Sequence, residues 1–199
     1  MFHANFAGGN GRDRTGRGVI YRGMAPFQIL TVKLARSVAL SEYTKHLEFE
    51  VVAGPCFGFV PGQWLSLKQN KPDGEEITRA YSIASPPDGN RFALCLNRVP
   101  DGFMSSYLCG LQVGTEISAQ GPFGSFILRP LLRDSIFIAT GTGIAPYRSM
   151  LQWLFADSSR HQGKRFWLVF GAVSRRTSTI TMSFFAWRPS TRTLSTCRP

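Results

Sequence analysis

Hydrophobic and polar residues alternate with period two along most of the chain between residues 24 and 130. The alternation is clearest in FQILTVKLARSVAL and TKHLEFEVV, and it returns in WLSLK, TRAYSIAS, RFALCLNRV and GTEISAQ. Turn chemistry separates these runs, as at Pro61 and Gly62 and in the NKPDGEE segment. Short alternating strands with turns at this spacing predict an antiparallel barrel or sandwich, interrupted by one helix in GFMSSYLCGL.

A different pattern begins near Asp134. The segment SIFIATGTGIAPYRSMLQWLFAD predicts an apolar strand, a glycine turn and an amphipathic helix, and KRFWLVFGA predicts a second apolar strand. A strand, a helix and a strand with both strands buried form a βαβ unit of a parallel sheet. The predicted fold class is therefore an antiparallel β-barrel followed by an incomplete α/β domain.

The pattern divides the chain into four parts. Residues 1–23 are rich in Gly and Arg and bury too little apolar surface to offset the entropy of ordering, so we expect a disordered extension. Residues 24–130 are the barrel domain, and residues 131–172 begin the α/β domain. Residues 173–199 show no periodicity and hold no acidic residue, so we expect an aberrant, disordered tail.

Charge and composition exclude several classes of protein. The formal net charge is +11, yet much of it lies at the two ends: residues 1–23 hold four arginines and one aspartate, and residues 173–199 hold five arginines. A nucleic-acid-binding protein would carry its basic surface in the folded middle, so we expect no nucleic-acid partner. No apolar run reaches the ~18 residues of a membrane helix, and we expect no signal peptide.

The four cysteines, at positions 56, 95, 109 and 197, form no C-x-x-C pair and no regular framework. This spacing disfavours a zinc site, an iron–sulfur cluster and a disulfide scaffold. Free thiols in a reducing compartment are the default, so we expect a cytoplasmic protein without a bound metal.

Residues 141–146 read GTGIAP between a predicted strand and a predicted helix. At such a position, glycines can bring backbone N–H groups and the helix N-terminus against a phosphate. The alternative is a tight turn that needs glycine for a positive φ, and a lone G-x-G does not decide between the two. Pro146 replaces the third glycine of the dinucleotide fingerprint, and proline suits the first turn of a helix.

Gly102 and Ser105, in DGFMSSYL, raise the same question at another helix start. A hydroxyl and free N–H groups there suit an anion, but taken alone the motif is more simply explained by an N-cap serine. The GPFG segment at 121–124 is most simply a turn.

Arg79 is the residue that packing and solvation explain least well. It lies in the predicted strand RAYSIAS, close to Tyr81 and Ser82. Arginine suits a phosphate, and a tyrosine ring can stack on a flat heterocycle. The serine hydroxyl can meet a polar atom of that heterocycle.

In combination these motifs resemble the ferredoxin–NADP reductase family. The motifs are R-x-Y-S, then G-x-x-S about twenty residues later, then G-P-x-G and G-T-G-I-A-P, and the resemblance covers roughly residues 24–172. It implies an FAD-binding antiparallel barrel followed by an NAD(P)-binding α/β domain.

The resemblance also implies roles for the matching residues. Arg79 would hold the FAD pyrophosphate, Tyr81 would stack on the isoalloxazine, and Ser82 would hydrogen-bond near the flavin N5, so Tyr81 and Ser82 are the catalytic candidates. The other cofactor-binding candidates are Leu96, Asn97 and Arg98 along the FAD, Gly102, Met104 and Ser105 over its pyrophosphate, and Gly141, Thr142, Gly143 and Pro146 at the nicotinamide nucleotide. Asn97 departs from the family pattern, which often has a lysine there.

By the same resemblance, the chemistry belongs largely to the cofactors. A hydride would pass from NAD(P)H to FAD, and single electrons would pass on to ferredoxin or a similar iron–sulfur or haem carrier. The resulting hypothesis is an FAD-dependent oxidoreductase of the ferredoxin–NAD(P) reductase type.

The end of the chain departs from the family. Family members continue for about a hundred residues past LVFGA, a length typical of such a domain, so we expect a truncation or a frameshift after residue 172. The alternative hypothesis is an FAD-binding fragment without turnover, because the nucleotide domain is incomplete.

Overall fold

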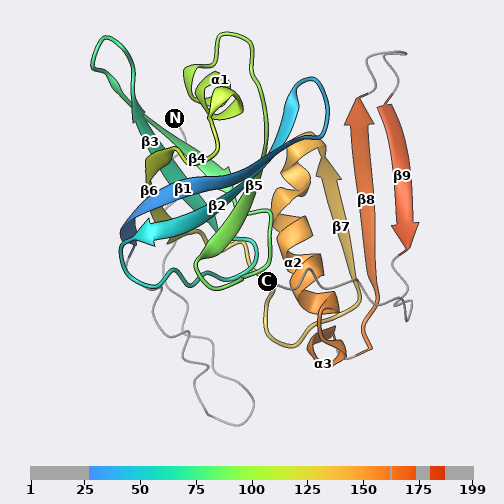
Figure 1. The fold of residues 1–199 in the computed structure, drawn as a ribbon. Helices are drawn as coiled ribbons and strands as arrows, with labels where there is room; N and C mark the ends of the chain where they lie inside the picture. The colour runs from blue at the N-terminus through green and yellow to red at the C-terminus, as the bar shows by residue number, and fades with distance from the viewer. Residues whose placement is uncertain (1–26, 162, 174–179, 187–199) are drawn as a thin grey trace, which may run out of the picture.

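The computed structural model describes residues 27–161, 163–173 and 180–186. Its first part is an antiparallel sheet of six strands in the order β4-β3-β6-β1-β2-β5 (Figure 1). The strands are β1 (Gln28–Ala39), β2 (Thr44–Ala53), β3 (Trp64–Asn70), β4 (Glu76–Ser82), β5 (Arg91–Asn97) and β6 (Glu116–Phe123). The two outer strands meet at the bridge between Ile83 and Leu94, which confirms the predicted barrel. The predicted extension over residues 1–23 lies outside the described residues.

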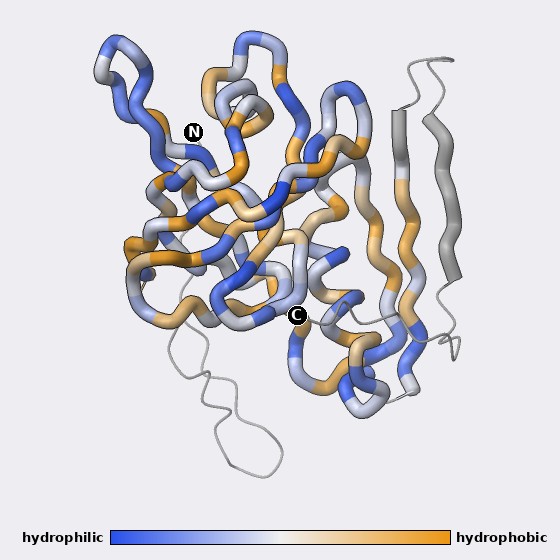
Figure 2. The backbone as a smooth tube through the Cα atoms, viewed as in Figure 1, coloured by the Kyte–Doolittle hydropathy of each residue, from blue (hydrophilic) through white to orange (hydrophobic). Residues whose placement is uncertain are grey.

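The period-two pattern works as predicted because each strand turns one face into a shared core. In β1, Leu30, Val32 and Leu34 are buried, and on the neighbouring β2 so are Leu47 and Phe49. The hydropathy of the tube changes along each strand in the same alternating way (Figure 2). Helix α1 (Phe103–Gly110) lies over the upper end of the sheet in Figure 1 and contacts β4.

The interpretation of GPFG as a turn is wrong for its first three residues. Gly121, Pro122 and Phe123 continue β6, where Gly121 pairs with Gln28 and Phe123 pairs with Trp64. A Cβ on Gly121 would lie 3.0 Å from the Cβ of Leu65. The close packing of two strands therefore explains the glycine at this position. A turn motif does not predict such a contact.

The second part is the predicted βαβ unit. Its elements are β7 (Ser135–Thr140), the 3₁₀ turn η1 (Gly141–Ile144), α2 (Ala145–Phe155), α3 (Ser158–His161), β8 (Phe166–Val173) and β9 (Ile180–Ala186). Strands β7 and β8 are parallel, and α2 connects them and lies between the barrel and this sheet (Figure 1). The predicted order of a barrel followed by an α/β unit is confirmed.

Two details of this unit differ from the prediction. We expected both strands to be buried, but Ile136 and Ile138 of β7 are 64% and 65% exposed. On the other face of β7, Phe137 stacks on Tyr147 and Phe166. Helix α2 therefore covers one face of β7 only. In the expected tail, residues 180–186 form strand β9, which pairs antiparallel with β8, while residues 174–179 and 187–199 lie outside the described residues.

Candidate functional site

Arg79 lies near the middle of β4, and its side chain is exposed. Its guanidinium Nη1 donates to the carbonyl of the adjacent Thr78 at 2.9 Å, and within the described residues it makes no salt bridge. An arginine without a carboxylate partner keeps most of its donors available for an anion such as a phosphate.

Tyr81 lies two residues further along β4 and packs against the barrel core while part of its ring stays accessible. Burial raises the pKa of its phenol to about 12, against the opposing effect of the Arg79 charge. The phenol is therefore neutral at all physiological pH values. Arg79 and Tyr81 share one face of the strand because side chains alternate, and Ser82 leaves the strand on the other face.

Gln63, which sequence reasoning missed, holds the strand end that carries Ser82. Its backbone carbonyl accepts the N–H of Ile83 at 3.0 Å. Its own side chain accepts the N–H of Val60 at 2.8 Å and donates to the carbonyl of Gly124 at 3.3 Å. A buried amide bonded at both ends fixes the backbone on either side of it. No short motif would signal this role, because each partner lies in a different segment.

The start of α1 differs from the interpretation of Ser105 as an N-cap. Gly102 is the N-cap residue, and no side chain caps the helix. The buried Ser105 hydroxyl accepts the N–H of Val99 at 3.0 Å and donates to the carbonyl of Gly102 at 3.1 Å. A Cβ on Gly102 would lie 2.8 Å from that hydroxyl, so the G-x-x-S spacing is a packing requirement. The side chain of Met104 is buried in the core, and the helix start offers a ligand its backbone N–H groups.

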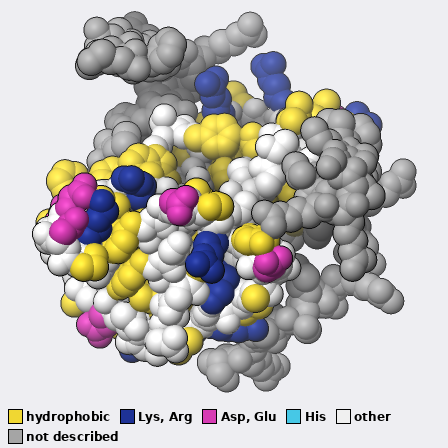
Figure 3. All heavy atoms as spheres, turned by 90° about the horizontal axis from the view of Figure 1, so that it is seen from above, with side chains coloured by type: hydrophobic (Ala, Val, Ile, Leu, Met, Phe, Trp, Pro, Cys, Tyr) yellow, Lys and Arg dark blue, Asp and Glu magenta, His cyan; other side chains and the backbone are white. Residues whose placement is uncertain are grey.

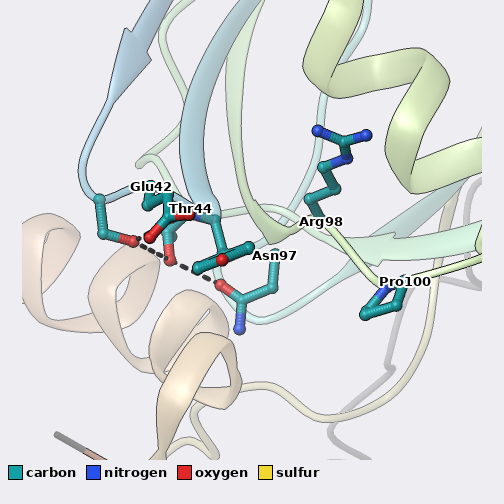
Figure 4. A pocket seen from close by; sticks show the side chains of 7 residues that line it. Glu42, Thr44, Asn97, Arg98 and Pro100 are labelled. Atoms are coloured by element: carbon teal, nitrogen blue, oxygen red, sulfur yellow. Dashed lines mark hydrogen bonds between the residues drawn. The ribbon is translucent and has the colours of Figure 1, made fainter. Parts of the chain in front are cut away.

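Leu96 and Asn97 end β5, Arg98 follows it, and the three side chains have different surroundings. Leu96 is 3% exposed and belongs to the core. Asn97 and Arg98 line a pocket of about 480 Å³ together with Ser41, Glu42, Tyr43, Thr44 and Pro100. Figure 4 shows Arg98 directed toward α1 and Thr44 directed at Asn97.

A chain of hydrogen bonds sets the orientation of the Asn97 amide (Figure 4). The Ser41 hydroxyl accepts the N–H of Thr44 at 3.1 Å and donates to the Thr44 hydroxyl at 3.0 Å. The Thr44 hydroxyl then donates to Oδ1 of Asn97 at 2.7 Å. Because its oxygen faces Thr44, the amide presents its NH₂ donors on the opposite side.

The GTGIAP segment forms the turn η1 and the first residues of α2, as predicted, and η1 contacts β5. Gly141 has a φ of +52°, which favours glycine, and nothing lies within 4 Å of a Cβ built on Gly141 or Gly143. The backbone of this turn is thus open to a ligand. Thr142 is partly exposed, and Pro146 occupies the first turn of α2.

Helix α2 is bonded to the segment that follows Ser82. Arg148 Nη1 donates to the carbonyl of Ala84, and the fully buried Ser149 hydroxyl donates to the carbonyl of Ser85 at 2.6 Å. These contacts join residues 64 positions apart. Periodicity places Arg148 and Ser149 on a helix but says nothing about their partners.

A small charged cluster lies beside α2 on the barrel. His46 Nε2 is 3.6 Å from Oε1 of Glu48, which also pairs with Arg36 at 3.1 Å. Burial lowers the pKa of His46, and the nearby charges of Arg148 and Arg36 lower it further, while Glu48 raises it. The imidazole is therefore neutral at pH 7.

Acidification is expected to destabilise the fold through His46. Its pKa is below 6.5 in the folded state, so the unfolded chain binds the proton more readily as the pH falls below 6.5. The stability present above pH 6.5 is lost as the pH falls through the folded-state pKa. Urea unfolding at pH 7.5 and 5.5 should show a larger loss for the parent chain than for His46→Gln. Equal losses would contradict this role.

The described residues include neither a membrane-spanning helix nor a metal site. On the face seen in Figure 3, basic side chains are scattered among hydrophobic and acidic ones. The described helices include none with the length and apolar character needed to cross a membrane. In the described part of the chain, His, Cys, Asp and Glu side chains form no cluster that could hold a metal ion.

Comparison with known proteins assigns both parts of the chain. Residues 31–127 match the family described as "Oxidoreductase FAD-binding domain", and residues 137–190 match "Oxidoreductase NAD-binding domain". The chain is 45% identical over 144 residues to ferredoxin–NADP reductase B of Sorangium cellulosum, covering 69% of this chain and 57% of that protein. The chain belongs to the ferredoxin–NADP reductase family.

Other members of the reductase family extend the comparison. The toluate 1,2-dioxygenase electron transfer component of Pseudomonas putida is 35% identical over 123 residues, which cover 61% of this chain and 36% of that protein. The crystal structure of ferredoxin–NADP⁺ reductase from Plasmodium falciparum with 2′P-AMP shares the fold, with a TM-score of 0.61 at 23% identity. That match covers 76% of this chain and 64% of the other. The chain thus spans 57% or less of the two sequence relatives.

The residues present fit the FAD that a family reductase binds. Arg79 offers an exposed guanidinium, Tyr81 an accessible part of a neutral ring, and α1 the N–H groups of its first turn. The open backbone at Gly141 and Gly143 fits the approach of a second nucleotide. Leu96, Met104 and Ser105 can contribute only through their backbone, because their side chains are buried.

Proposed function

We propose that this chain binds FAD and passes electrons between NAD(P)H and a one-electron carrier protein such as ferredoxin. The observation that carries the proposal is Arg79, an exposed cation that no described carboxylate pairs with, on the same face of β4 as the half-buried Tyr81. The family assignment supports the same reading. The reductase and dioxygenase relatives support the carrier as partner. The cytoplasmic location stays a prediction.

The residues of this chain would divide the work of holding the cofactors. Arg79 and the N–H groups at the start of α1 would neutralise the pyrophosphate of FAD. Tyr81 would stack on the isoalloxazine, and Ser82 would donate a hydrogen bond at its reactive edge. Bound FAD supplies the redox chemistry by accepting a hydride and releasing electrons one at a time.

The turn η1 would place the second nucleotide. Its exposed glycines let the backbone approach a phosphate closely, and Thr142 would lie near the nicotinamide. Asn97 would present its NH₂ group, oriented by Thr44, to the FAD. No side chain needs to act as an acid or a base, since alignment of two cofactors is the task of the protein.

A second candidate function is FAD binding without turnover. The observation that favours it is the bare face of β7, where Ile136 and Ile138 are exposed beside a sheet of three described strands. Such a unit would contact only part of a dinucleotide, so we expect weak NAD(P)H-dependent reduction of the bound FAD. Purification with bound yellow flavin, followed by an assay of NAD(P)H-dependent dye reduction, separates the two. A colourless chain that takes up no FAD would exclude both.

Replacing Ser82 with alanine is expected to leave FAD bound but to slow its reduction by NADPH about a hundredfold. One hydroxyl adds little to the affinity for a large cofactor, while misalignment at the reacting atom costs orders of magnitude in rate. Stopped-flow absorbance at saturating NADPH measures the rate, and flavin content after dialysis is the control. Reduction at the parental rate would remove Ser82 from the catalytic site.

A further inference from the structure

Residues 83–85 link the two parts of the molecule directly after Ser82. On the barrel side, the N–H of Ile83 donates to Gln63 at 3.0 Å and the N–H of Ala84 donates to Ala93 at 2.7 Å. The Ser85 hydroxyl also accepts the N–H of Ala93 at 3.0 Å. The barrel therefore binds the N–H groups of Ile83 and Ala84, and the carbonyls of Ala84 and Ser85 are left for α2.

Helix α2 binds those carbonyls. Arg148 donates to Ala84 and Ser149 donates to Ser85, so two consecutive helix residues grip two consecutive carbonyls. Ser149 and Ala84 are both 0% exposed, so each of the two bonds has one partner that water does not reach. A buried carbonyl that lost its donor would be costly, which keeps the contact closed.

The same helix begins at the open glycine turn. Arg148 lies four residues after Ile144, the last residue of η1, which is about 6 Å along a helix that rises 1.5 Å per residue. A short rigid helix thus connects the turn to the backbone just beyond Ser82. Movement of one end is transmitted to the other, because no flexible segment lies between them.

We propose that Arg148 and Ser149 are positioning residues that set the distance between the nucleotide turn and the flavin-binding strand end. The proposal rests on the proposed function for the identity of the two ligands. It concerns hydride-transfer geometry and leaves FAD affinity to Arg79. Removal of the two side chains should free the carbonyls of Ala84 and Ser85 and loosen this segment, so that its N–H bonds to the barrel open more often.

The test uses the full chain loaded with FAD and compares the double variant Arg148→Ala/Ser149→Ala with the parent. Hydrogen exchange measured by mass spectrometry should accelerate about tenfold in peptides covering residues 82–86. The FAD dissociation constant should change less than about twofold, and NADPH-dependent flavin reduction should slow. Gln152→Ala, one turn further along α2, is the matched control and should resemble the parent in all three measurements.

The single variant Arg148→Lys distinguishes a positioning role of Arg148 from a contribution to overall stability. Lysine keeps one donor at the Ala84 carbonyl, so exchange in residues 82–86 should return toward the parental rate. Unchanged exchange in the double variant would overturn the proposal, as would a parallel loss of FAD affinity and flavin reduction. If the parent binds no FAD, the proposed function fails. Exchange in the unloaded chain still shows whether Arg148 and Ser149 hold residues 84 and 85.

Discussion

Replacing Arg79 with alanine is expected to weaken FAD binding about ten- to hundredfold. The charge-assisted hydrogen bonds of a guanidinium to a phosphate contribute about 1.5–3 kcal/mol, and 1.4 kcal/mol corresponds to a tenfold change in affinity. Arg79 is exposed and forms no salt bridge with the described residues, so its loss leaves no charged protein group unpaired. Flavin fluorescence titration of the apoprotein measures the dissociation constant.

Two variants sharpen this prediction. Arg79→Lys retains the charge but loses the planar fork, so its affinity should fall between those of the parent and the alanine variant. Arg91→Ala removes another exposed arginine at the start of β5 and should bind FAD like the parent. Thermal unfolding without FAD should be the same for all four chains. Full flavin retention by Arg79→Ala after dialysis would assign the pyrophosphate to another group.

Replacing Gly62 with alanine is expected to lower the melting temperature by about 5–10 °C. Gly62 has a φ of +103°, and a Cβ there would lie 2.0 Å from the carbonyl oxygen of Phe126 and 2.4 Å from Cε of Met150 on α2. Strain of this kind costs about 2–3 kcal/mol, and a chain of this size loses about 2–4 °C per kcal/mol. The added methyl group lies at the contact between the barrel and α2.

Gly58→Ala provides the control, because nothing lies within 4 Å of a Cβ at that position. Its melting temperature should stay within about 1 °C of the parental value, as expected for a surface change. Circular dichroism during heating measures both variants. If Gly62→Ala and Gly58→Ala have the same melting temperature, α2 packs less tightly on the barrel than the structure shows.

The fold could be predicted further than the site, and the reason is physical. The alternation of apolar and polar residues in β1 and β2 is a local property, because the type of each residue indicates whether that residue is buried. The exposed Ile136 and Ile138 were misjudged because an apolar strand is buried only where another element covers it, and local sequence does not show the cover. Strand β9 was missed although its first five residues, ITMSF, alternate in the same way, because the run is short and lies in a segment without other strand signals.

At the site, the motifs predicted the right segments but not the role of each side chain. Ser105 was interpreted as an anion contact or an N-cap, whereas its hydroxyl bonds the Gly102 carbonyl and does not cap the helix. Gln63, Arg148 and Ser149 form the contacts that hold the end of β4, and no motif marks them. Such roles depend on residues distant in sequence, so they become visible only in three dimensions.

The most direct test of the central claim is a titration of the full apoprotein with FAD, followed by flavin fluorescence. Stacking on Tyr81 should quench the fluorescence, and the curve should saturate at one FAD per chain with a dissociation constant of about 1 μM or below. That affinity corresponds to about 8 kcal/mol of binding free energy. A linear curve without saturation would show that these residues do not form a flavin site.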